Sequence, residues 1–227
     1  MLMNRFTLSI SLSLCLTTAH GDTIADFDFT NDGNSFDSSA VVAGVSVSDL
    51  TNGIGMPAPA TNNAQGNPAP SLQFSFGDVE ANLAASVAAD DYYSFTVTPA
   101  PAASVTYNQF NFDFWKTSGA GANVQAVLFS SVDGFSVGDE LGFGQLSGNG
   151  AESGTWLPRS VSLGTLPTDI TTPVEFRLVI HDAGATNQNN QFRIDNIEVD
   201  ATVIPEPASA LLMLLGTGLL LRLRRRS

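Results

Sequence analysis

The chain of 227 residues carries 22 acidic and 9 basic residues, for a formal net charge of −13, and a single cysteine. Five of the basic residues lie near the two ends, so residues 22–203 hold four basic and 21 acidic residues, a net charge of −17. Such a surface repels phosphate backbones, which excludes nucleic-acid binding, and it repels anionic polysaccharide unless divalent cations intervene. The simpler interpretation of the charge is solubility.

The first 21 residues have the order of a secretory signal peptide. Arg5 supplies the positive start, and Phe6 to Leu16 is an apolar stretch interleaved with Ser and Thr. Ala19-His20-Gly21 places small residues where a signal peptidase recognises its substrate, so we expect cleavage before Asp22, with cleavage after Ala19 as the alternative. Cys15 lies inside the apolar stretch, so cleavage leaves a chain without thiols or disulfides.

Residues 22–203 are dominated by short runs in which apolar and polar residues alternate. In residues 109–115 (QFNFDFW), three phenylalanines alternate with polar residues, and residues 174–181 (VEFRLVIH) repeat the pattern. Alternation over so few residues predicts half-buried antiparallel strands. The sequence therefore predicts an all-β antiparallel two-sheet sandwich. Its expected strands are Ile24–Phe29, Val41–Val47, Leu72–Phe76, Tyr92–Val97, Gln109–Trp115, Val124–Phe129, Leu141–Leu146, Ser160–Leu163, Val174–His181 and Phe192–Val199.

Two segments between the strands differ from ordinary turns. Pro57 to Pro70 (PAPATNNAQGNPAP) is rich in Pro, Ala and Asn, which predicts a long exposed loop with polyproline character. Ala81–Ala89 (ANLAASVAA) is the place in this region where a short helical turn is expected.

The last expected strand changes its inward face partway along. Phe192 and Ile194 set one phase of the alternation, whereas Ile197 and Val199 set the other. The inward face therefore switches at Asp195-Asn196, which predicts a β-bulge there. A bulge can direct a polar side chain where a regular strand would not.

The inventory of catalytic residues is poor, and we predict that the protein is not an enzyme. His181 is the only histidine after residue 21, and we interpret it as a solvated residue at a strand end. Gly134–Gly138 matches G-x-S-x-G around Ser136, but turn and strand patterns follow it instead of the helix that a nucleophile elbow requires. Adjacent residues of a strand point to opposite faces, so neither Asp90-Asp91 nor Asp139-Glu140 can supply the two carboxylates that flank a glycosidic bond. We therefore interpret both pairs as solvated loop charges. An esterase or glycosidase hidden in loops is the alternative.

The last residues combine a short motif, an apolar run and a basic end. Pro205, Glu206 and Pro207 precede Ala208–Leu221, a run of 14 residues that would be about 21 Å long as a helix. A bilayer core is about 30 Å thick, so this run is short for a membrane span. A buried core helix is the alternative, but a core helix would not end in a cluster of arginines. The cluster consists of Arg222, Arg224, Arg225 and Arg226. The positive-inside rule places these arginines in the cytoplasm and the residues before the apolar run outside.

This order of features resembles the C-terminal sorting signal of PEP-CTERM proteins, which Gram-negative bacteria export and process with a membrane protease called exosortase. The resemblance implies a signal peptide at 1–21, a β-sandwich at 22–203 and a sorting signal with a membrane helix at 204–227. It implies an exosortase-type protease as partner and transient anchoring in the inner membrane. The processed protein would then reach the cell envelope, the surface or the extracellular matrix. We expect Thr202–Glu206 to be a short spacer.

The resemblance extends into the body. Leu128–Phe135 (LFSSVDGF) and Phe192–Val199 (FRIDNIEV) resemble recurring pieces of the sandwich bodies of PEP-CTERM proteins. The second segment is also similar to the closing strand of jelly-roll domains related to carbohydrate-binding modules. The similarity implies a jelly-roll-like body with a structural calcium ion between its first and last strands, and Asp28 and Asp195 as its ligands. No other cofactor is expected.

The calcium prediction also has support in the residues themselves. Oxygen-bearing side chains crowd the first expected strand and the loop after it, and hard oxygen ligands of this kind suit calcium. The EF-hand pattern fails there, and plain exposed carboxylates are the alternative. The residues concerned are Asp26, Asp28, Asp32, Asn34 and Asp37.

Two functions fit these features. The first is a non-enzymatic cell-surface or exopolysaccharide-matrix protein, sorted and cleaved through its tail. The second is a carbohydrate-binding module displayed at the cell surface, with exopolysaccharide as ligand and Trp115, Trp156, Tyr92 or Tyr107 as sugar platforms. A binding face needs these aromatic side chains exposed in one patch, whereas a structural sandwich buries them, and aromatic residues in strands usually belong to the core.

Overall fold

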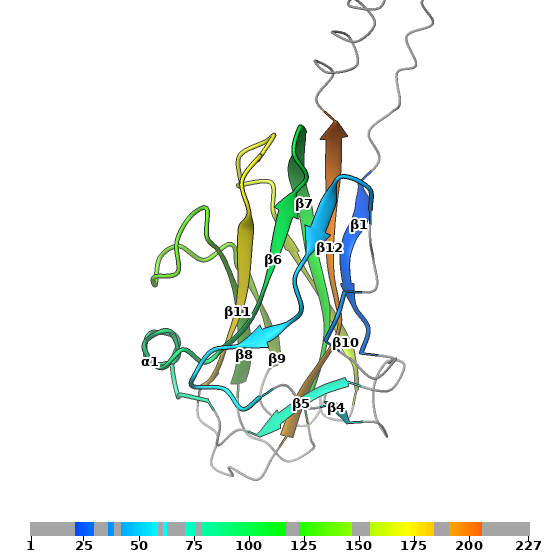
Figure 1. Cartoon of the computed structure of the whole chain (residues 1–227). Coiled ribbons are helices and arrows are strands. Elements are labelled where there is room, and N and C mark those ends of the chain that lie inside the picture. Colours follow the sequence, from blue (N-terminus) through cyan, green and yellow to red (C-terminus); the bar gives the residue numbers. More distant parts are fainter. Residues whose placement is uncertain are drawn as a thin grey trace, which may run out of the picture.

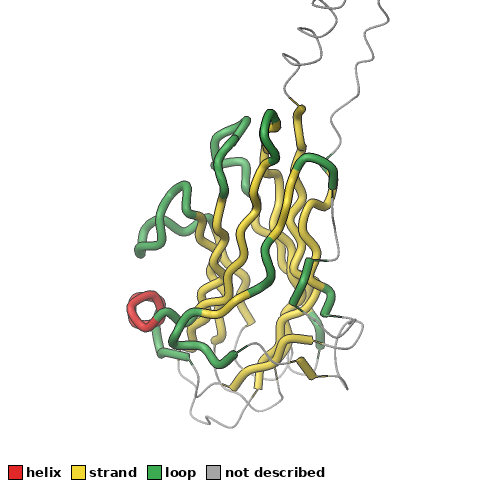
Figure 2. Tube along the Cα trace, in the orientation of Figure 1, coloured by secondary structure: helices red, strands yellow, loops and turns green. Residues whose placement is uncertain are grey.

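The computed structural model describes residues 21–29, 36–38, 42–58, 61–62, 71–75, 79–116, 123–146, 155–183 and 191–205. These residues form two antiparallel sheets that pack face to face (Figure 1). Figure 2 shows that strands make up most of the body, with one short helix lying against its side. The prediction of an all-β two-sheet antiparallel sandwich is confirmed.

Sheet A is built around two long strands, β7 and β12, which pair along nearly their whole length. Strands β1 and β5 both pair with the other edge of β12, where β1 covers Ile197–Ala201 and β5 covers Gln191–Ile194. The order across the sheet is β10 (Leu157–Ser162), β7 (Ala103–Lys116), β12 (Gln191–Pro205), β5 (Ser71–Ser75) and β4 (Thr61–Asn62), with β1 (Asp22–Phe27) beside β12.

Sheet B has β11 at its centre, paired with β6 on one side and β8 on the other. The order across this sheet is β2 (Val45–Val47), β6 (Tyr92–Pro99), β11 (Val174–Ala183), β8 (Asn123–Ser130) and β9 (Gly142–Leu146), with β3 (Thr51–Asn52) also paired to β6. The strands β3 and β4 were not predicted, because each is two residues long and too short to show an alternation of apolar and polar residues.

The core between the sheets consists largely of phenylalanine. Phe110, which alternation placed on the inward face of β7, is 1% exposed. Its ring centroid lies 6.1 Å from that of Phe176 on β11, which in turn lies 5.8 Å from Phe95 on β6. Burial of each such side chain contributes about 1.5–3 kcal/mol to folding, so these rings hold sheet A on sheet B.

The predicted bulge in β12 is confirmed. Asp195 pairs with Asp113 and Glu198 pairs with Asn111, so β12 has one residue more than β7 between these pairs. Asn196 supplies the extra residue with a φ of 48°, in the left-handed region that asparagine tolerates better than most residues. Both phases of the strand therefore face the core.

Strand β12 runs further than expected, to Pro205, which pairs with Ala103 of β7. The described part of the expected spacer, Thr202–Pro205, is therefore strand and not spacer. Asp22, the first residue of β1, pairs with Ala201 of β12, so the two ends of the described body lie at the same end of sheet A (Figure 1).

The expected helical turn is α1 (Leu83–Ala89). The Asn82 side chain caps its start by accepting a hydrogen bond of 3.0 Å from the Ala85 N–H. Leu83 and Val87 pack on the outer face of sheet B, against a small cluster formed by Val127, Phe129 and Val179. Within the described part of the chain, no helix is long and apolar enough to span a membrane. The expected signal peptide and the expected C-terminal helix lie outside the described residues.

Candidate functional site

The pairing of strands in sheet A places outward-facing residues of neighbouring strands in rows across its outer face. One row contains Trp115 of β7, Arg193 of β12 and Gln73 of β5, which are direct register partners. Trp156, just before β10, extends this row, since its ring centroid lies 6.3 Å from that of Trp115 with 36° between the planes. Both tryptophans are half-buried, so part of each remains open to solvent.

Arg193 fixes this row of side chains, which we call the tryptophan row. Its guanidinium carbon lies 4.1 Å from the centroid of the Trp115 ring, a cation–π contact. Its Nε donates a hydrogen bond of 3.1 Å to Gln73 Oε1, and its Nη2 donates one of 3.2 Å to Gln191 Oε1. Arg193 is 4% exposed, so these contacts hold Trp115 in one orientation against the sheet.

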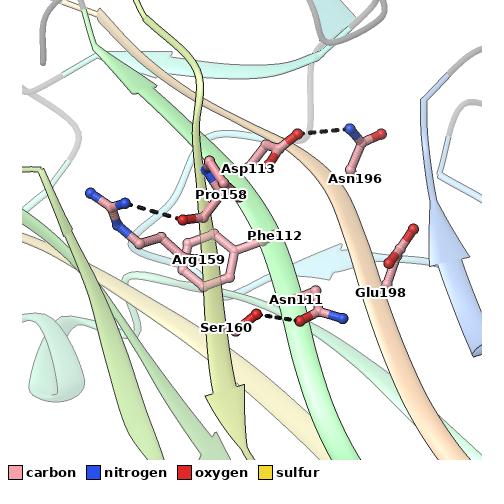
Figure 3. Close-up of a pocket in the computed structure, with 8 residues that line it drawn as sticks. All are labelled: Asn111, Phe112, Asp113, Pro158, Arg159, Ser160, Asn196 and Glu198. Atoms are coloured by element: carbon pink, nitrogen blue, oxygen red, sulfur yellow. Dashed lines mark hydrogen bonds between the residues drawn. The ribbon is translucent and has the colours of Figure 1, made fainter. Parts of the chain in front are cut away.

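The bulge lies beside the tryptophan row and carries amide and carboxylate groups. Asn196 Nδ2 donates a hydrogen bond of 2.9 Å to Asp113 Oδ2, which joins β12 to β7 (Figure 3). The Asn196 backbone N–H donates to Asp195 Oδ1 at 3.0 Å, and Asp195 is fully buried. The predicted bulge therefore brings polar groups close to Trp115 and Trp156.

A chain of hydrogen bonds crosses the sheet beyond the bulge. Ser160 Oγ on β10 donates to Asn111 Oδ1 on β7 at 2.6 Å (Figure 3), and Asn111 Nδ2 donates to Asp200 Oδ2 on β12 at 3.1 Å. Thr23 of β1 donates to the other oxygen of Asp200 at 2.9 Å. Four strands are therefore linked by side chains on the outer face of sheet A.

A shallow cavity of about 360 Å³ opens over the bulge and this chain of hydrogen bonds. Burial raises the pKa of Glu198 on its wall, and the nearby carboxylates of Asp26, Asp200 and Asp113 raise it further, against a hydrogen bond with Asn111 that lowers it. The cavity offers amide, hydroxyl and carboxylate groups to a ligand; its lining is Asn111, Phe112, Asp113, Pro158, Arg159, Ser160, Asn196 and Glu198.

The four aromatic candidates do not share one face. Trp115 and Trp156 lie together in the tryptophan row, as a sugar platform would require. Tyr92 lies on the outer face of sheet B, where the Arg177 guanidinium carbon is 4.3 Å from its ring centroid. Tyr107 is 2% exposed and faces the core, so the expectation that it is an exposed platform is wrong. Arg193 was not among the residues predicted for a site, although an arginine at an outward position of a strand was the available signal.

The two expected calcium ligands lie near the bulge. Asp28 follows β1 one residue beyond Phe27, which pairs with Ile197 of β12, and Asp195 is fully buried within the bulge. Among the residues that the structure describes, no group of three or more His, Cys, Asp or Glu side chains is arranged to hold a metal ion. Calcium at Asp28 and Asp195 therefore stays a prediction, which the melting temperature in calcium and in EDTA would test.

His181, Ser136 and Asp91 were considered for catalysis, and each is either buried or lies in a turn. His181 is 7% exposed, with Nε2 3.1 Å from Gln125 Oε1, so its interpretation as a solvated residue is wrong, and burial lowers its pKa. Ser136 lies in a turn between β8 and β9, and no helix follows it within residues 123–146. Asp91 is also buried and accepts a hydrogen bond of 3.0 Å from the Glu80 N–H, so it is not a solvated loop charge.

The tail defines the class of protein. Residues 203–227 match the family model of the PEP-CTERM protein-sorting motif, so the chain carries this motif. The motif indicates an exported protein that is anchored transiently in the membrane. Pro205 ends β12, whereas Glu206, Pro207 and the four arginines lie outside the described residues. No curated protein sequence matches the chain.

Solved structures that match the chain include two carbohydrate-binding modules and an adhesin domain. The C-terminal family 22 carbohydrate-binding module of Clostridium thermocellum Xyn10B is 9% identical, with 79% of this chain and 94% of that chain covered and a TM-score of 0.41. The CBM22-1 xylan-binding domain of Paenibacillus barcinonensis Xyn10C is 10% identical, with 82% and 98% covered and a TM-score of 0.40. The K3 cleaved adhesin domain of Lys-gingipain from Porphyromonas gingivalis is 16% identical, with 80% and 99% covered and a TM-score of 0.40.

Proposed function

We propose that this protein is an exported, non-catalytic glycan-binding protein of the cell surface or exopolysaccharide matrix, sorted and cleaved through its C-terminal signal by an exosortase-type protease. The observation that carries the glycan-binding part is the tryptophan row. It places two half-buried indole rings, Trp115 and Trp156, beside hydrogen-bonding groups on one face of sheet A.

The chemistry of this face suits a polyhydroxylated ligand. Binding sites for small molecules and sugars combine aromatic surface with a few placed polar groups. Here the aromatic surface is fixed by Arg193, and the cavity next to it is lined by the amides of Asn111 and Asn196 and the hydroxyl of Ser160. Because most of these polar groups already bond to one another, they are held in place before a ligand arrives.

The absence of catalysis is part of the proposal. A glycosidase needs two carboxyl groups on either side of the bond that it cleaves, one of them with a raised pKa. Glu198 has a raised pKa, but its neighbours Asp26 and Asp200 lie on the same open sheet surface and Asp200 is engaged by Thr23 and Asn111. Such a surface favours binding over cleavage.

Calorimetric titration with soluble polysaccharides tests the proposal. The released protein is titrated with xylan, a soluble cellulose derivative, galactan and the exopolysaccharide of the producing bacterium. We expect Trp115→Ala and Trp156→Ala each to weaken binding about tenfold, since loss of one aromatic contact costs about 1.4 kcal/mol. Tyr92→Ala is the matched control, because it removes an aromatic side chain from the outer face of sheet B.

The outcomes separate the two functions. Loss of binding in the tryptophan variants but not in Tyr92→Ala supports a glycan-binding face on sheet A. Equal weakening in all three variants would indicate a general loss of folding, whereas unchanged binding in all three would place the ligand elsewhere. No binding to any polysaccharide by the unaltered protein would contradict the glycan-binding role and leave an exported structural component of the matrix.

A further inference from the structure

The sorting motif begins inside the folded body. Strand β12 stays paired with β7 through the pairs Val203–Val105, Ile204–Ser104 and Pro205–Ala103. Residues 203–205 are also the first three residues of the match to the sorting motif. Pro205 lacks a backbone N–H and therefore suits the end of a strand, where one donor fewer is needed.

The end of β12 is held by side chains as well as by pairing. Val203 packs against the hydrophobic core, and a Cβ added to Gly44 would lie 2.8 Å from its Cγ1, so the loop before β2 lies directly on it. Its partner Val105 is fully buried and exchanges two backbone hydrogen bonds with Ile170, of 2.8 and 2.9 Å. Opening this end of β12 therefore means separating Val203 from Val105, which Ile170 holds in place from the other side.

A protease acts on a segment that is free to enter its active site, and a segment paired within a packed sheet becomes free only by local unfolding. We propose that the folded sandwich sets the upstream limit of tail processing: the peptide bonds as far as Ile204–Pro205 are protected, and the processed chain ends at Pro205 or further downstream. This inference rests on the processing stated in the proposed function. In hydrolysis a peptide C–N bond breaks, and water supplies the hydroxyl of the new carboxyl group and a proton to the amine of the released tail.

The first test locates the C-terminus of the released protein. The full chain is expressed in the producing bacterium, and protein from the envelope and the medium is analysed by intact-mass and fragmentation mass spectrometry. We expect the last residue to be Pro205 or a later one. A C-terminus between Ala201 and Ile204 would overturn the inference. A chain that still ends at Ser227 would instead contradict the processing itself, which belongs to the proposed function.

A second test asks whether the fold or the protease sets the limit. Ser104→Pro removes a backbone donor from β7 opposite Ile204 and leaves residues 203–227 unchanged. We expect this variant to release additional species that end upstream of Pro205. The matched control is Ser162→Pro, the same change at the end of β10 on the opposite edge of sheet A, which should release the same species as the unaltered protein.

A milder variant covers the case in which Ser104→Pro does not accumulate. Val105→Ala removes two methyl groups from the buried partner of Val203 and keeps the backbone pairing possible. Upstream ends in Val105→Ala, in a smaller share than in Ser104→Pro, would support the inference. A C-terminus identical to that of the unaltered protein in every recovered variant would show that protease specificity alone determines the site, and would overturn it.

Discussion

Asn196 of β12 donates a hydrogen bond of 2.9 Å to Asp113 of β7 at the point where the pairing of these two strands shifts by one residue. The bond ties the extra residue of the bulge to the neighbouring strand. Because of this shift, Ile194 and Ile197 both face the core although three positions separate them. The bulge therefore lets one strand supply the core along its whole length and also present polar groups at the cavity.

The first prediction concerns the bulge residue. Asn196→Val places a β-branched side chain at a φ of 48° and removes the bond to Asp113, so we expect a loss of about 2–3 kcal/mol in the free energy of unfolding. Asn196→Gly keeps the backbone conformation and loses the side-chain bond to Asp113, so its cost should be about 1 kcal/mol. Urea denaturation measures both, and equal stability of the two variants would contradict the role of the left-handed conformation.

The second prediction is a pH dependence. The pKa of Glu198 is raised in the folded state, so between its ordinary and raised values the folded state holds a proton that the unfolded state has lost. Stability due to Glu198 therefore falls as pH rises through that window. We expect Glu198→Gln to be more stable than the unaltered protein at pH 7, with the difference vanishing at about pH 4.

Chemical denaturation at the two pH values checks this prediction. Asp22→Asn is the control for removal of one negative charge, because Asp22 is exposed at the start of β1. A gain in stability of the same size in Asp22→Asn would show that the effect comes from net charge and not from the surroundings of Glu198 in the cavity.

The third prediction concerns a buried hydroxyl. Tyr107 is 2% exposed, and its hydroxyl has no hydrogen-bond partner among the residues that the structure describes. Burial of the hydroxyl raises the pKa of Tyr107 well above its ordinary value. Tyr107→Phe removes an unsatisfied polar atom and keeps the ring that contacts Phe176, so we expect stability to be unchanged or to rise by up to about 1 kcal/mol. A loss of stability in thermal denaturation would show that the hydroxyl has a partner in solution.

The fourth prediction concerns close packing of a loop against the end of α1. A Cβ at Gly55 would collide with the carbonyl oxygen of Ala89 and the carboxylate of Asp91. We expect Gly55→Ala to cost about 1–3 kcal/mol because backbone cannot move aside as a flexible side chain can. Gly164→Ala is the control, since its added Cβ would meet only Ser162 Oγ, at 3.6 Å. Equal melting temperatures for the two variants would contradict this reason.

The elements that could be predicted from the sequence are those whose residues carry their own period. The alternation in Gln109–Trp115 indicated β7, and the change of phase at Asp195-Asn196 indicated the bulge. The start of β7 at Ala103 was missed because the alternation of Ala103, Val105 and Tyr107 is out of phase with that of Phe110–Phe114. The end of β12 at Pro205 was missed because its own residues do not alternate clearly and it is defined by its pairing with β7.

The candidate site was predictable only in part for a similar reason. Trp115 and Trp156 were identified by residue type, but their contact depends on the register between β7 and β10, which the sequence does not state. Arg193 was overlooked because its partners come from β5 and β7, far away in the chain. Tyr107 was misassigned because alternation near the start of β7 was not recognised.

The two ends of the described body lie at one end of sheet A, away from the tryptophan row. Asp22 and Pro205 lie at one end of sheet A, whereas Arg193 lies twelve residues back along β12 from Pro205, which is about 40 Å of strand. The tryptophan row therefore lies at the opposite end of sheet A from Pro205, where the sorting motif continues. A copy held through its tail would present the proposed glycan-binding face at the end of sheet A that lies away from its attachment point.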